Sequence, residues 1–262
     1  MGMSKKRRDE LKRENPICYF CATAPTEVPD HVPSRQCFRG RVGPEGFEFP
    51  ACDRCNQMSP QLEQVFALYL MMGDHSEDPI DDAAFKKLLQ GVANNNPDLM
   101  PVLNLTARQA RQHYKGRGLN LPVGMTFSEA PLAELPVGNR DAFLAFSRRL
   151  TCALYYKEVG HPLPLDFKIA TGWVQIVDPS ARPLEKAVID FLPEFRMTER
   201  RNTNIGDQFQ YRWGHKDEGI FAFAAQLRAS FYIIGAAVSP AFPTGDDPKW
   251  QVHRDDVGTS DL

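Results

Sequence analysis

This chain lacks a strong charge of either sign and a long hydrophobic run. Its 262 residues carry 31 Lys and Arg against 33 Asp and Glu, so its formal net charge is only −2. Any contact with nucleic acid must therefore come from a local basic patch. The most apolar late stretch, Ala229 to Val238, is too short to span a bilayer. The basic N-terminus has no apolar segment behind it, so it is not a secretory signal, and we expect a cytoplasmic protein.

The sequence also lacks a Walker loop and a dinucleotide-binding fingerprint, which are the usual signs of a nucleotide site. Cysteine is sparse as well, with six residues. Four of the six stand in two Cys-x2-Cys pairs, which fits metal binding in a reducing compartment better than a disulfide framework. Cys37 and Cys152 are left over and are expected to be partly buried thiols.

The two cysteine pairs are Cys18 with Cys21 and Cys52 with Cys55. Two thiolates on one tight turn can reach a single tetrahedral ion, and a second such turn completes a four-sulfur shell. A four-cysteine shell leaves no open position for water. The pattern therefore predicts a structural Zn²⁺ rather than a catalytic one.

Three further residues of the same stretch could carry chemistry. Asp30 and Asn56 both offer oxygen, which suits a hard divalent ion such as Mg²⁺ or Mn²⁺. His31 follows Asp30 directly, and imidazole is the usual general base near neutral pH. This combination is typical of a hydrolase in which a base activates water while a bound ion stabilises a phosphate and its leaving oxygen.

Residues 15–72, with their cysteine pairs and their Asp-His, resemble the zinc-stapled form of the HNH (ββα-metal) endonuclease family. The resemblance implies that Asp30 and Asn56 are the ligands of a catalytic Mg²⁺ or Mn²⁺ and that His31 is the base. It further implies a hairpin whose first strand ends at the Asp-His pair, followed by a helix that begins at the second cysteine pair. One position departs from the family pattern, because Phe47 stands where the family has its middle Asn.

Less specific interpretations of these residues remain open. The four cysteines could form a plain zinc ribbon that only stiffens a binding module. Asp30 and His31 could be a capping pair in a turn before Pro33, and Asn56 could be an ordinary first-turn residue of a helix.

Arginines near the Asp-His pair are the candidates for contacts with nucleic-acid phosphates. They are Arg35, Arg39, Arg41 and Arg54, and three of them, Arg35, Arg39 and Arg54, are also candidates for steadying the transition state. The charged run from Ser4 to Glu14 is expected to be a short helix or a frayed arm with a solvated face.

The rest of the chain indicates an α+β fold, with a helical middle and a C-terminal antiparallel sheet with helices. Apolar periodicity predicts helices over 53–72, 81–94, 106–114, 141–158 and 183–191, and strands over 167–177, 209–213, 220–227 and 230–238. Gly and Pro recur from 116 to 138, as in a linker. We therefore expect an HNH-like module over 1–75, a helical segment and connection over 76–138, and an α+β domain over 139–262.

Two functions follow from these patterns. The first is a metal-dependent endonuclease, acting on nucleic acid, with DNA as the expected partner; the resemblance implies a role in phage defence, restriction or mobile-element biology. The second is a catalytically inactive, zinc-stapled adaptor for nucleic acid or protein. The C-terminal domain could read substrate, bind a regulatory partner or form a homo-oligomer, and the sequence does not distinguish these roles. It also leaves open the strandedness and sequence of the substrate and any need for an activator.

Overall fold

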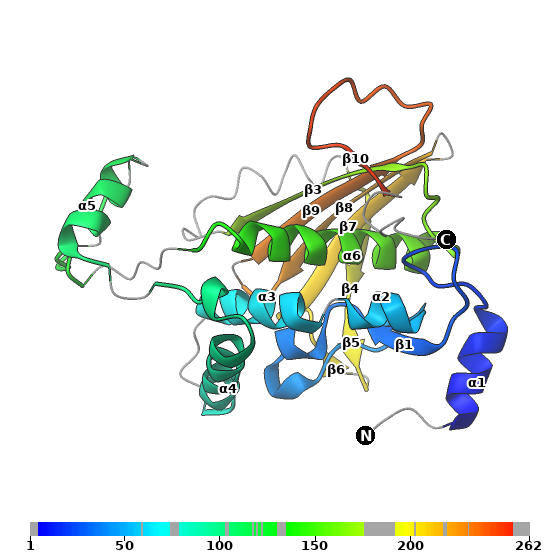
Figure 1. Ribbon diagram of the computed structural model, residues 1–262, viewed down its shortest axis with the longest axis horizontal. Helices are drawn as coiled ribbons and strands as arrows, with labels where there is room; N and C mark the ends of the chain where they lie inside the picture. The colour runs from blue at the N-terminus through cyan, green and yellow to red at the C-terminus, as the bar shows by residue number, and fades with distance from the viewer. Residues whose placement is uncertain are drawn as a thin grey trace.

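The computed structural model describes residues 5–58, 60–73, 79–102, 105–116, 118, 120–121, 123–129, 135–175, 192–201, 203–216, 219–229 and 231–253. Within these ranges the fold mixes helices with antiparallel sheet, as the sequence predicts (Figure 1). No helix of the described ranges has the length and apolar character needed to cross a membrane.

The N-terminal part is built around a short hairpin. Helix α1 (Lys5–Glu14) precedes strand β1 (Val28–His31), which pairs antiparallel with β2 (Glu48–Ala51). The loop between the strands holds two short 3-10 turns, η1 (Arg35–Cys37) and η2 (Arg39–Arg41). Helix α2 (Asp53–Gln57) follows β2 directly. The order strand, strand, helix is thus present, with His31 as the last residue of β1.

Helices make up the middle of the chain. They are α3 (Pro60–Gly73), α4 (Pro79–Asn95), the 3-10 turn η3 (Pro97–Leu99), α5 (Ala107–Gly116) and α6 (Asn139–Val159). In Figure 1, α6 runs across one face of the large sheet, α3 lies beside α6, and α5 stands apart from the body of the molecule. Gly160 ends α6 with a φ of 90°, a left-handed conformation that glycine adopts without strain.

The C-terminal part forms a six-stranded antiparallel sheet in the order β10-β3-β9-β8-β7-β4. These strands are β3 (Lys168–Gln175), β4 (Glu194–Met197), β7 (Phe209–Lys216), β8 (Ile220–Leu227), β9 (Phe231–Val238) and β10 (Gln251–Val252). Between β4 and β7 the chain makes a separate small hairpin, β5 (Glu199–Arg200) with β6 (Thr203–Asn204).

Strict alternation of buried residues places one face of this sheet in the core. In β8 every second residue is buried, and the same holds along most of β9. Because side chains alternate between the two faces of a strand, Phe221 and Phe223 of β8 and Ile233 of β9 lie on the covered face. Helix α6 covers that face, where Phe143 stacks on Phe231 with ring centroids 5.6 Å apart.

The buried residues of the hairpin, of α3, of α6 and of the sheet form one continuous hydrophobic cluster. Phe66 of α3 stacks on Phe146 of α6 with ring centroids 3.7 Å apart, and Phe47 before β2 packs edge-on against Phe209 of β7 at 5.3 Å. The division into parts at 75 and 138 stays a prediction. The packing joins the first and last of these parts through a shared core.

One predicted helix is wrong in its extent. The sequence predicts a single helix over 53–72, whereas α2 ends at Gln57 and a new helix, α3, begins at Pro60. Proline has no backbone N–H and its ring clashes with the preceding turn, so it opens a helix and does not continue one. The helix predicted over 183–191 lies outside the described residues. The other helices and strands predicted from periodicity are present, and their observed ends differ from the predicted ends by at most three residues.

Gly235 of β9 is packed tightly against the side chain of Phe223 on β8 and against α6. A Cβ atom there would lie 2.3 Å from Cε1 of Phe223 and 2.8 Å from Oγ1 of Thr151 on α6. We expect Gly235→Ala to lower the free energy of unfolding by about 1–3 kcal/mol, because the overpacked helix must shift. Urea denaturation measures this loss.

The matched control is Gly172→Ala on the neighbouring strand β3. A Cβ at Gly172 would meet nothing within 4 Å, so we expect no loss of stability there. Equal destabilisation by the two substitutions would contradict the close packing of α6 on β9.

Candidate metal centre and histidine site

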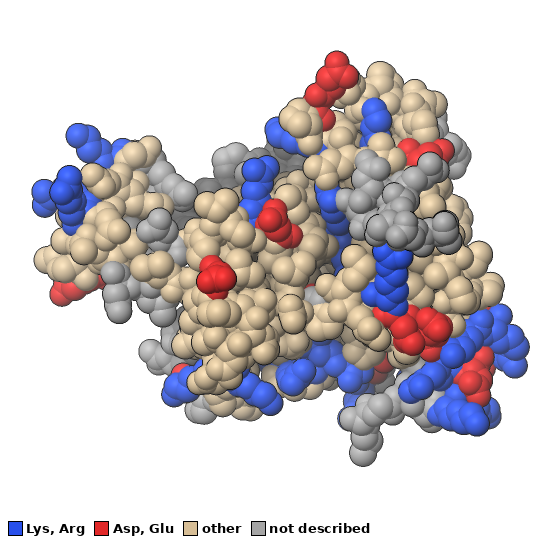
Figure 2. All heavy atoms as spheres, in the orientation of Figure 1, with Lys and Arg blue, Asp and Glu red and all other residues tan. Residues whose placement is uncertain are grey.

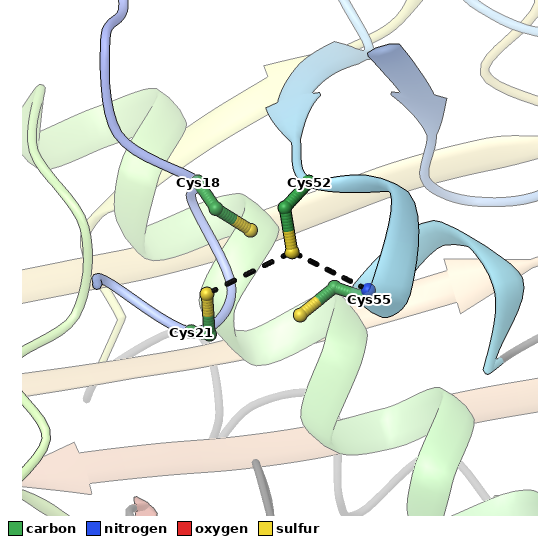
Figure 3. Close-up of side chains that lie close together, drawn as sticks. All are labelled: Cys18, Cys21, Cys52 and Cys55. Carbon is green, nitrogen blue, oxygen red and sulfur yellow. Dashed lines mark hydrogen bonds between the residues drawn. The ribbon is translucent and has the colours of Figure 1, made fainter. Parts of the chain in front are cut away.

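The four predicted zinc ligands come together. The sulfur atoms of Cys18, Cys21, Cys52 and Cys55 all lie within 4.8 Å of one another, and all four residues are buried. In Figure 3 the side chains of one pair point toward those of the other across a common centre. Such a cluster could hold a metal ion, and four thiols are the ligand set of a closed tetrahedral zinc site.

Local backbone geometry presents each pair. Cys52 is the N-cap of α2, and its sulfur accepts a hydrogen bond from the N–H of Cys55 at 3.4 Å. In the first pair, the N–H of Ala22 donates to the carbonyl oxygen of Cys18 at 3.0 Å, and Ala22 takes a φ of 55°. Each of these two tight turns therefore brings the two sulfur atoms of its cysteine pair close together.

The proximity of the thiols is suited to a cation. Hydrogen bonds with the thiols of Cys18 and then Cys55 lower the pKa of Cys21. Hydrogen bonds with Cys18 and Cys21 raise the pKa of Cys55 instead, because adjacent thiolates repel each other. A divalent cation at the centre removes this repulsion and allows all four sulfurs to ionise.

Asp30 lies in a buried ion pair. Its carboxylate is 5% exposed, and its Oδ2 atom accepts hydrogen bonds from Nε and Nη2 of Arg149 at 2.9 and 2.6 Å. The same oxygen accepts a third bond from the hydroxyl of Tyr19 at 2.6 Å. Burial raises the pKa of Tyr19 well above its ordinary value, which keeps the phenol neutral and able to donate.

The expected Mg²⁺ or Mn²⁺ does not fit this arrangement. Arg149 comes from α6, and its Nη1 also donates to the carbonyl oxygen of Cys55 at 2.8 Å. Its guanidinium therefore lies between Asp30 and α2. The resemblance would put the metal ion in this same place. Asn56, the second predicted ligand, is half-buried on α2, and among the described residues no hydrogen bond joins its side chain to Asp30. The positive charge beside Asp30 is therefore the guanidinium of Arg149 and not a metal ion.

His31 lies in a surface hollow beside the hairpin. The hollow is lined by His31, Pro33, Arg35, Gly43, Pro44, Phe47, Glu48 and Arg200. The Nε2 atom of His31 is 3.7 Å from Oε1 of Glu48. Among the described residues its Nδ1 has no hydrogen-bond partner. Burial, and then the charge of Arg35, lower the pKa of His31 from its ordinary value, so the ring is neutral at neutral pH and can accept a proton.

The four predicted arginines occupy different surroundings. Arg35 lines the hollow and reaches Oε1 of Glu48 at 3.5 Å. Arg39 donates from Nε to Asp81 at 3.1 Å and lies 3.5 Å from Asp207, which places it in an ion-pair cluster away from His31. Arg41 and Arg54 are exposed, the first on η2 and the second on α2, and neither lines the hollow.

Phe47 has a structural role. It is 5% exposed and makes edge-on ring contacts with Phe49, Phe209 and Tyr211. The loop behind His31 is closed by the backbone instead, because the N–H of Val32 donates to the carbonyl oxygen of Phe47 at 3.3 Å. An aromatic side chain at this position joins the hairpin to the sheet.

Two arginines at these sites escaped the sequence analysis. Arg149 pairs with Asp30 from 119 positions away, and Arg200 reaches the hollow from the C-terminal half. The signal that Arg149 is buried was its position on the apolar stripe of α6, three residues after Phe146 and four before Ala153. Arg200 carries no comparable sequence signal.

Comparisons of this chain with protein-family models, with curated proteins and with solved structures give no match.

The cysteine cluster predicts a metal dependence of the fold. We expect the purified protein to carry one Zn²⁺ per chain, and we expect Cys52→Ser to lose most of it, because a three-thiolate site binds the ion far more weakly. Zinc content is measured by atomic absorption, and chelation of the ion from the wild type should lower the Tm.

Cys37→Ala is the matched control for this loss. Cys37 is a buried thiol that does not belong to the four-cysteine cluster. Its substitution should leave the zinc content unchanged. Full zinc retention by Cys52→Ser would contradict the four-cysteine site.

The buried ion pair predicts a large cost for removing Arg149. We expect Arg149→Met to destabilise the protein by about 3–5 kcal/mol in urea denaturation, because it leaves two buried carboxylates, those of Asp30 and Glu63, without their guanidinium partner. Adding Asp30→Asn to this variant should recover part of the loss.

Arg140→Met serves as the control, since Arg140 is exposed in the first turn of the same helix. It should change stability by less than about 0.5 kcal/mol. A cost for Arg149→Met as small as that of the control would show that Asp30 is not held by this pair.

Proposed function

We propose that this chain is an endonuclease that hydrolyses phosphodiester bonds of nucleic acid, with His31 as the general base and a zinc ion as a structural staple. The observation that carries the proposal is the position of His31. It ends strand β1, faces a surface hollow and has Arg35 beside it. A base and a cation in one solvent-accessible hollow are the minimal requirements for attack of water on a phosphate.

In this proposal His31 takes a proton from the attacking water. Its lowered pKa supports that role, because a base must be unprotonated at the working pH. Arg35 offers positive charge to the phosphate, and Glu48 lies 3.5 Å from Arg35 and 3.7 Å from His31, close enough to orient both. The proposed substrate is DNA, and the HNH-like identity of the module belongs to the same proposal.

The resemblance also implies a catalytic Mg²⁺ or Mn²⁺ at Asp30 and Asn56. Asp30 is neutralised by Arg149, and so an ion at Asp30 and Asn56 would have to displace a buried guanidinium. We therefore assign no step of the reaction to the ion, and metal dependence is a result that the assay must supply.

The second candidate function is the inactive zinc-stapled adaptor, and the Asp30–Arg149 pair favours it. A carboxylate that is buried and bonded to Arg149 and Tyr19 supports a fixed structure rather than a metal-exchanging site. In that case the hollow and its arginines bind a partner without cleaving it.

Plasmid cleavage separates the two functions. We expect the zinc-loaded wild type, supplied with Mg²⁺ or Mn²⁺, to nick or linearise plasmid DNA, and we expect His31→Ala to lower the rate at least about a hundredfold, because a general base contributes that much. Products are followed by gel electrophoresis at matched zinc content.

The control is His161→Ala, which removes an exposed histidine of the loop after α6 and should cleave at the wild-type rate. Equal inactivity of wild type and His31→Ala on duplex DNA, single strands and RNA would reject the nuclease in favour of the adaptor.

A further inference from the structure

The small hairpin β5–β6 contacts the loop between β1 and β2, and Gly43 and Pro44 of that loop line the His31 hollow. The backbone N–H of Glu45 donates to the carbonyl oxygen of Glu199 on β5 at 3.0 Å. The Nη1 atom of Arg200 donates to the carbonyl oxygen of Gly43 at 3.2 Å. These bonds between residues more than 150 positions apart fix Arg200 at the hollow, across from Arg35 and His31.

The contacts of Arg200 do not use up its guanidinium. Its ionic partner Glu45 is 4.0 Å from Nε and is 59% exposed, and such surface pairs contribute little. The bond to Gly43 occupies one of the five N–H donors that an arginine side chain carries. Within the described part of the chain, Arg149 is the opposite case, since Asp30 and the carbonyl of Cys55 hold its guanidinium in the core.

The charges around the hollow favour an anionic ligand. Arg7 of α1 reaches Oε2 of Glu48 at 2.9 Å, and Arg35 reaches Oε1 of the same carboxylate at 3.5 Å. Among the residues that line the hollow, Arg35 and Arg200 are positively charged and Glu48 is negatively charged, which leaves a positive excess. Figure 2 shows further Lys and Arg side chains gathered over α1, with acidic side chains among them.

We propose that Arg200, together with Arg35, binds a backbone phosphate of the nucleic-acid strand beside His31. The inference rests on the proposed function and deepens it, because it makes the C-terminal half a part of the substrate site. Two planar guanidinium groups match the oxygens of a phosphodiester, and a strand fixed between them would present its phosphorus to the face of the hollow that holds His31.

The test is the salt dependence of DNA binding by wild type, Arg200→Gln, Arg35→Gln and Arg200→Lys. A labelled duplex and a labelled single strand are titrated with zinc-loaded protein at several salt concentrations, without divalent ions, and binding is followed by fluorescence anisotropy. Each lost phosphate contact reduces the slope of log K against log salt by about 0.9 on duplex or about 0.7 on single strands.

We expect Arg200→Gln and Arg35→Gln each to show this reduction and to bind more weakly on every sequence. Arg200→Lys should keep the slope, because it keeps the charge, while losing affinity with the two-pronged contact. Lys86→Gln is the matched control. It removes one positive charge from the exposed face of α4, outside the hollow, and should leave the slope unchanged.

The outcomes separate the failure of this inference from the failure of the proposed function. If wild type binds DNA and Arg200→Gln keeps the wild-type slope and affinity, Arg200 is not a phosphate contact. The same conclusion follows if Lys86→Gln loses as much as Arg200→Gln, since binding would then depend only on total charge. If wild type neither binds nor cleaves DNA or RNA, the proposed function fails and the phosphate site fails with it.

Discussion

The ion pair between Asp30 and Arg149 is the contact on which the arrangement of this protein depends. It joins the end of β1 to the middle of α6, and through the carbonyl of Cys55 it also holds the start of α2. A buried guanidinium is tolerated only when its charge is matched and its donors are used. The hairpin, the turn that carries Cys52 and Cys55 and the long helix α6 are therefore held in one fixed geometry.

The same ion pair fixes the role that Asp30 has in this structure. Its Oδ2 atom accepts hydrogen bonds from Arg149 and Tyr19, so the carboxylate holds the hairpin against α6. The hollow lies at another part of the hairpin, where His31 ends β1 and Glu48 begins β2. Three segments meet there, namely α1, the loop between β1 and β2, and the β5–β6 hairpin. The hollow is therefore a property of the whole chain and not of its first 75 residues.

Local patterns in the sequence determined a large part of this protein. The spacing of Cys18 with Cys21 and of Cys52 with Cys55 is a matter of one turn each, so the cluster could be predicted without a fold. Periodicity located α4, α5, α6 and the four long strands, because a buried stripe or an alternating face is written into consecutive residues. The position of His31 at the end of a strand came from the resemblance to the HNH family and not from periodicity, and β1 does end there.

Tertiary structure decided the partners of these residues. Arg149 and Arg200 reach Asp30 and the hollow from far along the chain, and no local pattern specifies which buried or exposed arginine will meet which carboxylate. Phe47 became the contact between hairpin and sheet because the core closed around it. The sequence by itself determined which groups could bind metal and accept protons. Only the fold decided that Asp30 is neutralised by an arginine, because that depends on charge burial between segments that meet after folding.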